Sequence, residues 1–289
     1  MAAGLPLMSS TPIQPLSQVA PAPWVPPRLQ WAAAAADVAQ GVAMWRTWLA
    51  LGWHDVRQRY RRSLLGPLWI TLSMGITVAA LGVLYARLFA QPIDEYLPFV
   101  ALGFIAWGLI SGLLLEASTV FVAAETFLRQ VRLPLSFYVL RLAWRQLVVF
   151  GHNLLIFVVV ALALPVAVNA NTLLVVPALL LVMLNALWVV LLLGLICTRF
   201  RDVPQIVAAV VQVSFFLTPI VWRPGQLVRE TWVVNANPFH HLVELLRAPL
   251  LGMAPSALSW TVGVALGLGG GALTFALLAR YRYRVPYWV

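Results

Sequence analysis

Six stretches of the chain are mostly apolar and contain no Asp, Glu, Lys or Arg. Each approaches the roughly 20 residues with which an α-helix crosses a bilayer. The pattern predicts an all-α polytopic membrane protein with six transmembrane helices. The predicted spans are Leu64–Ala86, Tyr96–Leu115, Gln146–Val168, Leu173–Thr198, Val203–Trp222 and Pro255–Ala279.

The segment before the first span has two parts. Residues 1–30 hold seven of the 20 prolines and no charge before Arg28, a composition typical of a disordered tail. From Asp37 to Arg62, apolar side chains recur every three or four residues, with arginines mostly on the other side. Within residues 31–63 this pattern predicts an amphipathic helix that lies flat in the membrane interface. A soluble helix packed on a partner is the alternative.

The loop between the second and third spans contains a short amphipathic stretch, residues 125–134. We predict a helix here that Pro134 stops. Its apolar side chains would be exposed to water in a plain loop, so we expect them to bind in a groove on a partner. An ordinary basic linker is the alternative. The candidate residues are Glu125, Phe127, Leu128, Arg129, Val131, Arg132, Leu133 and Pro134.

The loop between the fifth and sixth spans, residues 223–254, contains an apolar stretch from Pro238 to Leu251. This stretch is too short to cross a bilayer. It predicts a re-entrant or interfacial helix, and a plain surface helix is the alternative.

The arginines are distributed unevenly about the predicted spans. If the N-terminus is cytoplasmic, the segments on that side carry 15 arginines and the outer segments carry four. Because cytoplasmic loops of membrane proteins hold the excess of basic residues, we predict that both termini are cytoplasmic.

An arginine cluster just before the first span suits a phosphate-bearing lipid head, since each guanidinium can donate two parallel hydrogen bonds. Membrane anchoring is the alternative role for these residues, which are Arg57, Arg59, Tyr60, Arg61 and Arg62.

Composition excludes several classes of protein. Hydrophobic residues make up 62% of the chain and charged residues only 10%, against about 25% charged in soluble domains, so lipid must solvate much of the surface. All 19 basic residues are arginine, and without lysine the chain has no ordinary P-loop for ATP. The four histidines lack metal-ligand spacing, and no nucleophile–base pair is visible. We therefore expect no metal, no cofactor and no catalytic site in this chain, and no nucleic-acid partner.

Two further sets of residues are candidates within the spans. Glu116 is the only acidic residue in an apolar run, and such residues are often functional; we expect it near the inner interface. Asp55 is expected to pair with a neighbouring arginine. Aromatic rings can pack against sugar C–H surfaces, although helix packing or a lipid-facing belt is the alternative for each. These channel candidates are Trp69, Tyr85, Phe104, Trp107 and Phe121.

Three motifs in order resemble permeases of the type-2 ABC transporter family. They are Arg-Tyr-Arg-Arg-Ser-Leu-Leu-Gly-Pro-Leu-Trp at 59–69, Arg-Leu-Pro at 132–134, and Asn-Pro-Phe-His-His-Leu-Val-Glu-Leu-Leu-Arg at 237–247. The likeness runs from about Trp45 to Arg284 and is greatest to exporters of O-antigen or capsular polysaccharide from Gram-negative bacteria.

The resemblance implies a homodimer in the inner membrane, with two copies of a separate ATPase that binds ATP and Mg. It implies that residues 125–134 form a coupling helix against the ATPase and that the lipid-linked glycan passes between the two permease copies. It also implies that the last outer loop folds back into the membrane, with the candidates Asn237, Pro238, His240, Glu244 and Arg247.

Three other functions are kept as alternatives. The same family includes exporters of small drugs or lipids. An ion-coupled secondary transporter needs several buried ionisable groups, for which only Glu116 is in place. A membrane glycosyltransferase needs an acidic metal site, which the sequence does not show.

Overall fold

The computed structural model describes residues 27–59, 61, 66, 68–131, 133–226 and 231–289. Within these residues the chain consists of helices joined by turns and short connections, and no strand is present. The prediction of an all-α membrane protein is confirmed.

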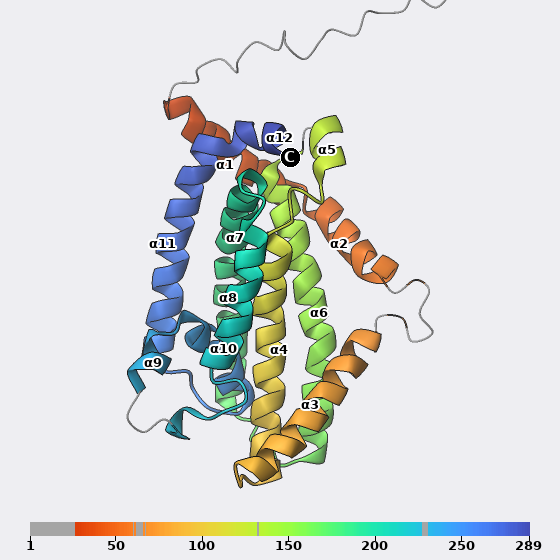
Figure 1. Cartoon of the computed structure of the whole chain (residues 1–289), viewed down its shortest axis with the longest axis vertical. Coiled ribbons are helices and arrows are strands. Elements are labelled where there is room, and N and C mark those ends of the chain that lie inside the picture. The colour runs from red at the N-terminus through yellow and green to blue at the C-terminus, as the bar shows by residue number, and fades with distance from the viewer. Residues whose placement is uncertain (1–26, 60, 62–65, 67, 132, 227–230) are drawn as a thin grey trace, which may run out of the picture.

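Five helices in the described part of the chain are long and apolar enough to cross a membrane. They match five of the six predicted spans (Figure 1). Helix α4 is the most buried of the five and packs against α3, α6 and α7, whereas α3 is the least buried and α11 packs against α7. These helices are α3 (Leu68–Leu88), α4 (Ile93–Ala117), α6 (Leu135–Ala163), α7 (Val175–Arg199, preceded by the 3₁₀ turn η2, Ala170–Leu174) and α11 (Ala257–Tyr281).

The fifth predicted span, Val203–Trp222, is only partly helical. Helix α8 (Val203–Leu217) has 15 residues, which corresponds to a rise of about 22 Å. This is short of the roughly 30 Å thickness of a bilayer core. The fifth predicted span is therefore helical only over Val203–Leu217, and its apolar pattern continues through residues 218–222, which are not helical.

The non-helical residues 218–222 are buried against the rest of the bundle. Arg247 Nη1 donates a hydrogen bond to Pro219 O at 2.6 Å. Ile220 lies directly against α4 at Gly103, where a Cβ atom would come within 2.9 Å of Ile220 O. Irregular backbone at membrane depth is tolerated only where protein surrounds it, and these contacts supply that surrounding.

Helix α6 begins at Leu135, well before the predicted start of the third span at Gln146. The prediction placed the boundary after Arg141 and Arg145 because charges usually mark the end of a span. Both arginines lie within the helix, where carboxylates on other helices neutralise them. The early start extends α6 toward α5 (Glu125–Gln130).

The predicted interface helix is two helices, α1 (Pro27–Ala43) and α2 (Trp45–Arg59), which meet at Met44. The first turn of α1 falls in the segment predicted to be disordered, and residues 1–26 lie outside the described part of the chain. The break occurs because α1 is fixed to the start of α6. Asp37 accepts hydrogen bonds from the Leu135 and Ser136 backbone N–H groups at 3.1 and 3.0 Å.

The segment after α8 folds back among the long helices. It contains η3 (Pro224–Gln226), α9 (Thr231–Ala236) and α10 (Pro238–Leu250). Most residues of α10 are buried, and the helix packs against α4, α7 and α11. The alternative prediction of a plain surface helix is therefore wrong, and α10 is part of the bundle.

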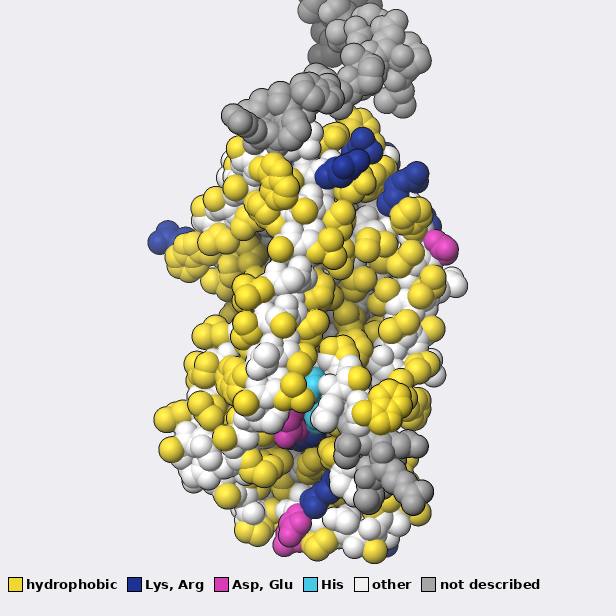
Figure 2. Space-filling view, turned by 90° about the vertical axis from the view of Figure 1, so that its left-hand side faces the viewer, with side chains coloured by type: hydrophobic (Ala, Val, Ile, Leu, Met, Phe, Trp, Pro, Cys, Tyr) yellow, Lys and Arg dark blue, Asp and Glu magenta, His cyan; other side chains and the backbone are white. Residues whose placement is uncertain are grey.

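The two ends of the bundle differ. At one end, here the α5 end, lie α1, α5, η4 (Arg282–Arg284) and α12 (Val285–Trp288); the opposite end, here the α9 end, holds α9 and the connection between α3 and α4 (Figure 1). Figure 2 shows hydrophobic side chains over the middle of the α11 face, with basic side chains toward the α5 end. This apolar belt is the surface that lipid is expected to cover.

Candidate functional site

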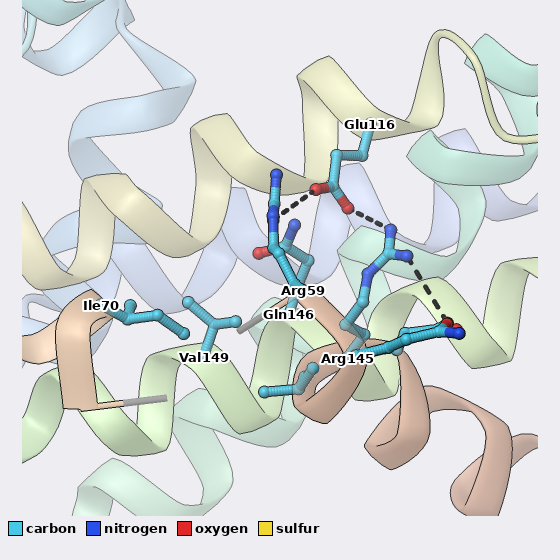
Figure 3. Close-up of a pocket in the computed structure, with 9 residues that line it drawn as sticks. Arg59, Ile70, Glu116, Arg145, Gln146 and Val149 are labelled. Atoms are coloured by element: carbon cyan, nitrogen blue, oxygen red, sulfur yellow. Dashed lines mark hydrogen bonds and ion pairs between the residues drawn. The ribbon is translucent and has the colours of Figure 1, made fainter. Parts of the chain in front are cut away.

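Five charged side chains from three helices meet near the α5 end, and Figure 3 labels Arg59, Glu116 and Arg145 among them. Arg141 donates two hydrogen bonds to the Asp55 carboxylate, at 2.8 and 2.6 Å. Arg145 forms an ion pair with Glu116 and lies 3.6 Å from Asp55. Arg59 lies 3.5 Å from the other oxygen of Glu116. We call these residues the charge cluster: Asp55, Arg59, Glu116, Arg141 and Arg145.

The sequence positions this cluster through ordinary helix geometry. Arg141 and Arg145 are four residues apart, so they project from the same face of α6. Asp55 lies on α2, and Glu116 lies in the last turn of α4. The two carboxylates therefore reach α6 from two different helices, and the cluster ties α2 to the centre of the bundle. Three arginines against two carboxylates leave it with net positive charge.

A cavity of about 680 Å³ lies beside the charge cluster. Its walls include Arg59, Glu116 and Arg145, together with apolar side chains of α3 and α6 (Figure 3). Gln146 is pressed against α4 at Gly112, where a Cβ atom would come within 2.7 Å of Gln146 Oε1. The volume is in the range of ligand sites, roughly 300–1,000 Å³. It can hold a polar head group within reach of the arginines.

Of the predicted entry arginines, Arg59 lines this cavity. Arg57, Arg59 and Arg61 are exposed, and Arg59 belongs to both the cavity wall and the charge cluster. Tyr60 and Arg62 lie outside the described residues.

The predicted coupling segment differs from expectation in two respects. Helix α5 ends at Gln130, because Val131 is already extended. Pro134 does not stop this helix; it is the N-cap residue of α6. Arg132 lies outside the described residues.

The apolar side chains of this segment also divide into two kinds. Phe127 and Val131 are 55% and 47% exposed, whereas Leu128 is 8% exposed and belongs to the core. Leu133 is partly buried against the core. Arg129 pairs with Glu125 at 2.9 Å. Only part of the predicted ridge can meet a partner.

The channel candidates are not brought together. Phe104 and Trp107 pack against Phe215, with ring centroids 5.7 and 6.0 Å apart, and Phe121 is fully buried. These three rings belong to the core of a single copy. Trp69 is 49% exposed on α3; Tyr85, on the same helix, stacks on Phe89 with centroids 5.6 Å apart.

The candidates of the α9 end form a structural network around α10. Asn237 accepts a hydrogen bond from Phe239 N–H at 2.9 Å and so caps the helix, and Pro238 occupies its first turn. Arg247 is 1% exposed and binds Glu244 at 2.7 Å. His240 is buried beside His241, with ring centroids 5.2 Å apart.

Sequence reasoning missed the partners of the charge cluster. Asp55 was expected to pair with a neighbouring arginine, yet it binds Arg141, which is 86 residues away. Asp37, which caps α6, was not singled out at all. The available signal was the i, i+4 pair of Arg141 and Arg145 at the edge of a long apolar run.

Bundled apolar helices with an embedded charge cluster define a multi-pass membrane protein. Residues 46–251 match the ABC-2 type transporter family. The chain belongs to this family, and it is the transport permease subunit of a transporter that associates with an ABC ATPase. Comparison with curated proteins finds no match.

Proposed function

We propose that this chain is the permease of an ATP-driven exporter of lipid-linked polysaccharide, O-antigen or capsule, in a bacterial inner membrane. The observation that carries the proposal is the cavity beside the charge cluster, with Arg59 in its wall and the exposed Arg57 and Arg61 two residues away from Arg59 in the chain. The proposal places the α5 end in the cytoplasm, where lipid-linked precursors carrying phosphate are made available.

The net positive charge of the cluster supports an anionic substrate. Arg59 is 64% exposed and holds Glu116 at 3.5 Å, a weak contact for an exposed pair. A phosphate-bearing head can displace this contact, because charge-assisted hydrogen bonds from guanidinium to phosphate are among the strong ones. Arg57 and Arg61 form no ion pair with any described residue and can attract the head first.

The arrangement of α3 and α8 supports a homodimer with the glycan path between the copies. Helix α3 is the least buried of the long helices, and only Val211 and Ser214 of α8 are buried. Both helices border α4. A second copy can cover these faces and leave Trp69 near the path.

Substrate-dependent ATP hydrolysis tests the proposal. The complex is purified with its ATPase, reconstituted, and offered a lipid-diphosphate-linked oligosaccharide, the same lipid without phosphate, or a small amphiphilic drug. We expect stimulation by the first only, and loss of that stimulation in Arg57→Gln/Arg61→Gln. Each arginine near an anionic surface contributes about 1 kcal/mol. Stimulation by the drug alone would identify a small-molecule exporter instead.

A further inference from the structure

The last residues of the chain form a wall of a groove at the α5 end. The groove has a volume of about 730 Å³ and is lined by three separate segments. Helix α1 contributes Gln40, α5 and the connection after it contribute Arg129 and Val131, and the C-terminal segment contributes Arg282 and Tyr287. We call it the end groove.

Helix α12 is anchored to its neighbours through its main chain and its buried side chains. Arg129 of α5 donates a hydrogen bond to Val289 O, and Arg201 donates to Trp288 O at 3.2 Å. Val285 and Val289 are 0% and 5% exposed. These contacts fix α12 beside α5, so we expect the two short helices to move together.

The same anchoring leaves an apolar surface uncovered. Tyr287 is 70% exposed and Tyr283 37%, and both line the end groove that Val131 also lines. Phe127, 55% exposed, lies on α5 and lines a separate cavity with Tyr138 and Arg141. An apolar surface contributed by two elements at one end of a molecule is typical of an interaction site.

The charge left over at the groove is positive. Asp37 is engaged by the backbone of α6, and Glu125 by Arg129. Within the described part of the chain, Arg282 and Arg284 form no ion pair. A partner that fits therefore presents an apolar side chain for the groove and carboxylates for its rim.

We propose that the ATPase docks on the whole end groove, with α12 as its second wall, and not on α5 alone. The inference rests on the proposed function, because it takes an ATPase as the partner of this chain. A protein fits better than a lipid surface, since α1, α5 and α12, which border the groove, lie at the end of the bundle (Figure 1), whereas lipid is expected to cover the flanks. An apolar side chain of the ATPase then enters between Val131 and Tyr287.

Site-specific photo-crosslinking in native membranes tests this inference. p-Benzoylphenylalanine replaces Phe127, Tyr287 or, as a control at the α9 end, Trp232, which is 69% exposed. We expect adducts from positions 127 and 287 that contain the same P-loop polypeptide, identified by mass spectrometry, and none from position 232. An adduct with the ATPase at 127 but lipid or nothing at 287 overturns the inference while the proposed function stands. No ATPase adduct at either position contradicts both.

Quantitative retention of the ATPase provides the second readout. Tyr287→Ala should lower the affinity of the ATPase by about fivefold or more, as truncation of an interface aromatic does, while Tyr287→Phe should leave it unchanged. Thermal unfolding of the permease should not shift, because the side chain is exposed. Retention of the ATPase by Tyr287→Ala at the level of Trp232→Ala would overturn the inference.

Discussion

At the residue scale, Glu116 has two arginine partners on different helices. Arg145 belongs to α6 and Arg59 to α2, so one carboxylate restrains both around the end of α4. The contact with Arg145 is the stronger, because its side chain is 27% exposed against 64% for Arg59. Loss of the carboxylate leaves partly buried positive charge without compensation.

Glu116→Gln should therefore loosen α2 from the bundle. We expect the free energy of unfolding to fall by about 1–2 kcal/mol, since both partners remain partly solvated. Chemical unfolding in detergent, followed by tryptophan fluorescence, measures the change. Asp94→Asn, an exposed acid at the other end of the same helix, is the matched control and should be neutral. An equal effect of the two variants would show that the charge cluster contributes no stability.

At the element scale, α5 presents two adjacent side chains with different roles. Phe127→Ala removes an exposed ring, so we expect weaker ATPase binding and unchanged thermal stability. Leu128→Ala removes a core side chain, and such truncations typically cost about 2–5 kcal/mol. Parallel measurement of melting temperature and ATPase recovery separates the two. A large drop in melting temperature for Phe127→Ala would mean that α5 packs differently.

The connection between α10 and the bend after α8 depends on Arg247. Arg247→Met removes its bonds to Glu244 and Pro219 O, and breaking a buried ion pair costs about 3–5 kcal/mol. We expect a lower melting temperature and easier proteolysis near residues 218–222. Arg87→Gln, an exposed arginine at the end of α3, should change stability by less than about 0.5 kcal/mol. Similar melting temperatures for the two variants would contradict the assigned role of Arg247.

The long helices could be predicted from sequence because an apolar run of about 20 residues has few other stable environments. Their boundaries could not be predicted where charge was neutralised in three dimensions, as at Arg141. The break at Met44 was equally hidden, since it depends on Asp37 meeting a helix 98 residues later. The burial of Leu128 beside exposed Phe127 depends on how α5 docks, and periodicity in six residues does not determine that.

At the scale of the whole molecule, the exposed faces of α3 and α8 predict a dimer interface. Cysteines at Ile76 and Val213, which are 59% and 57% exposed, are introduced in a Cys197→Ala background. We expect a disulfide or short cross-link between copies from at least one of them. The control is Val159 on α6, which is 66% exposed and should give none. Cross-linking from Val159 alone would move the interface to another face.

Helix α1 joins the bundle through contacts with residues that are far away in the sequence. Trp31 lies against Phe275, with ring centroids 5.6 Å apart, and Asp37 holds the start of α6. At a translation rate of roughly 5–20 residues per second, α1 waits on the order of 10 s on the ribosome for α11 to be made. During that time the membrane surface and α6, once it has been made, cover its apolar face. Trp31→Ala should therefore slow the final maturation of the protein and leave insertion of the earlier helices unaffected.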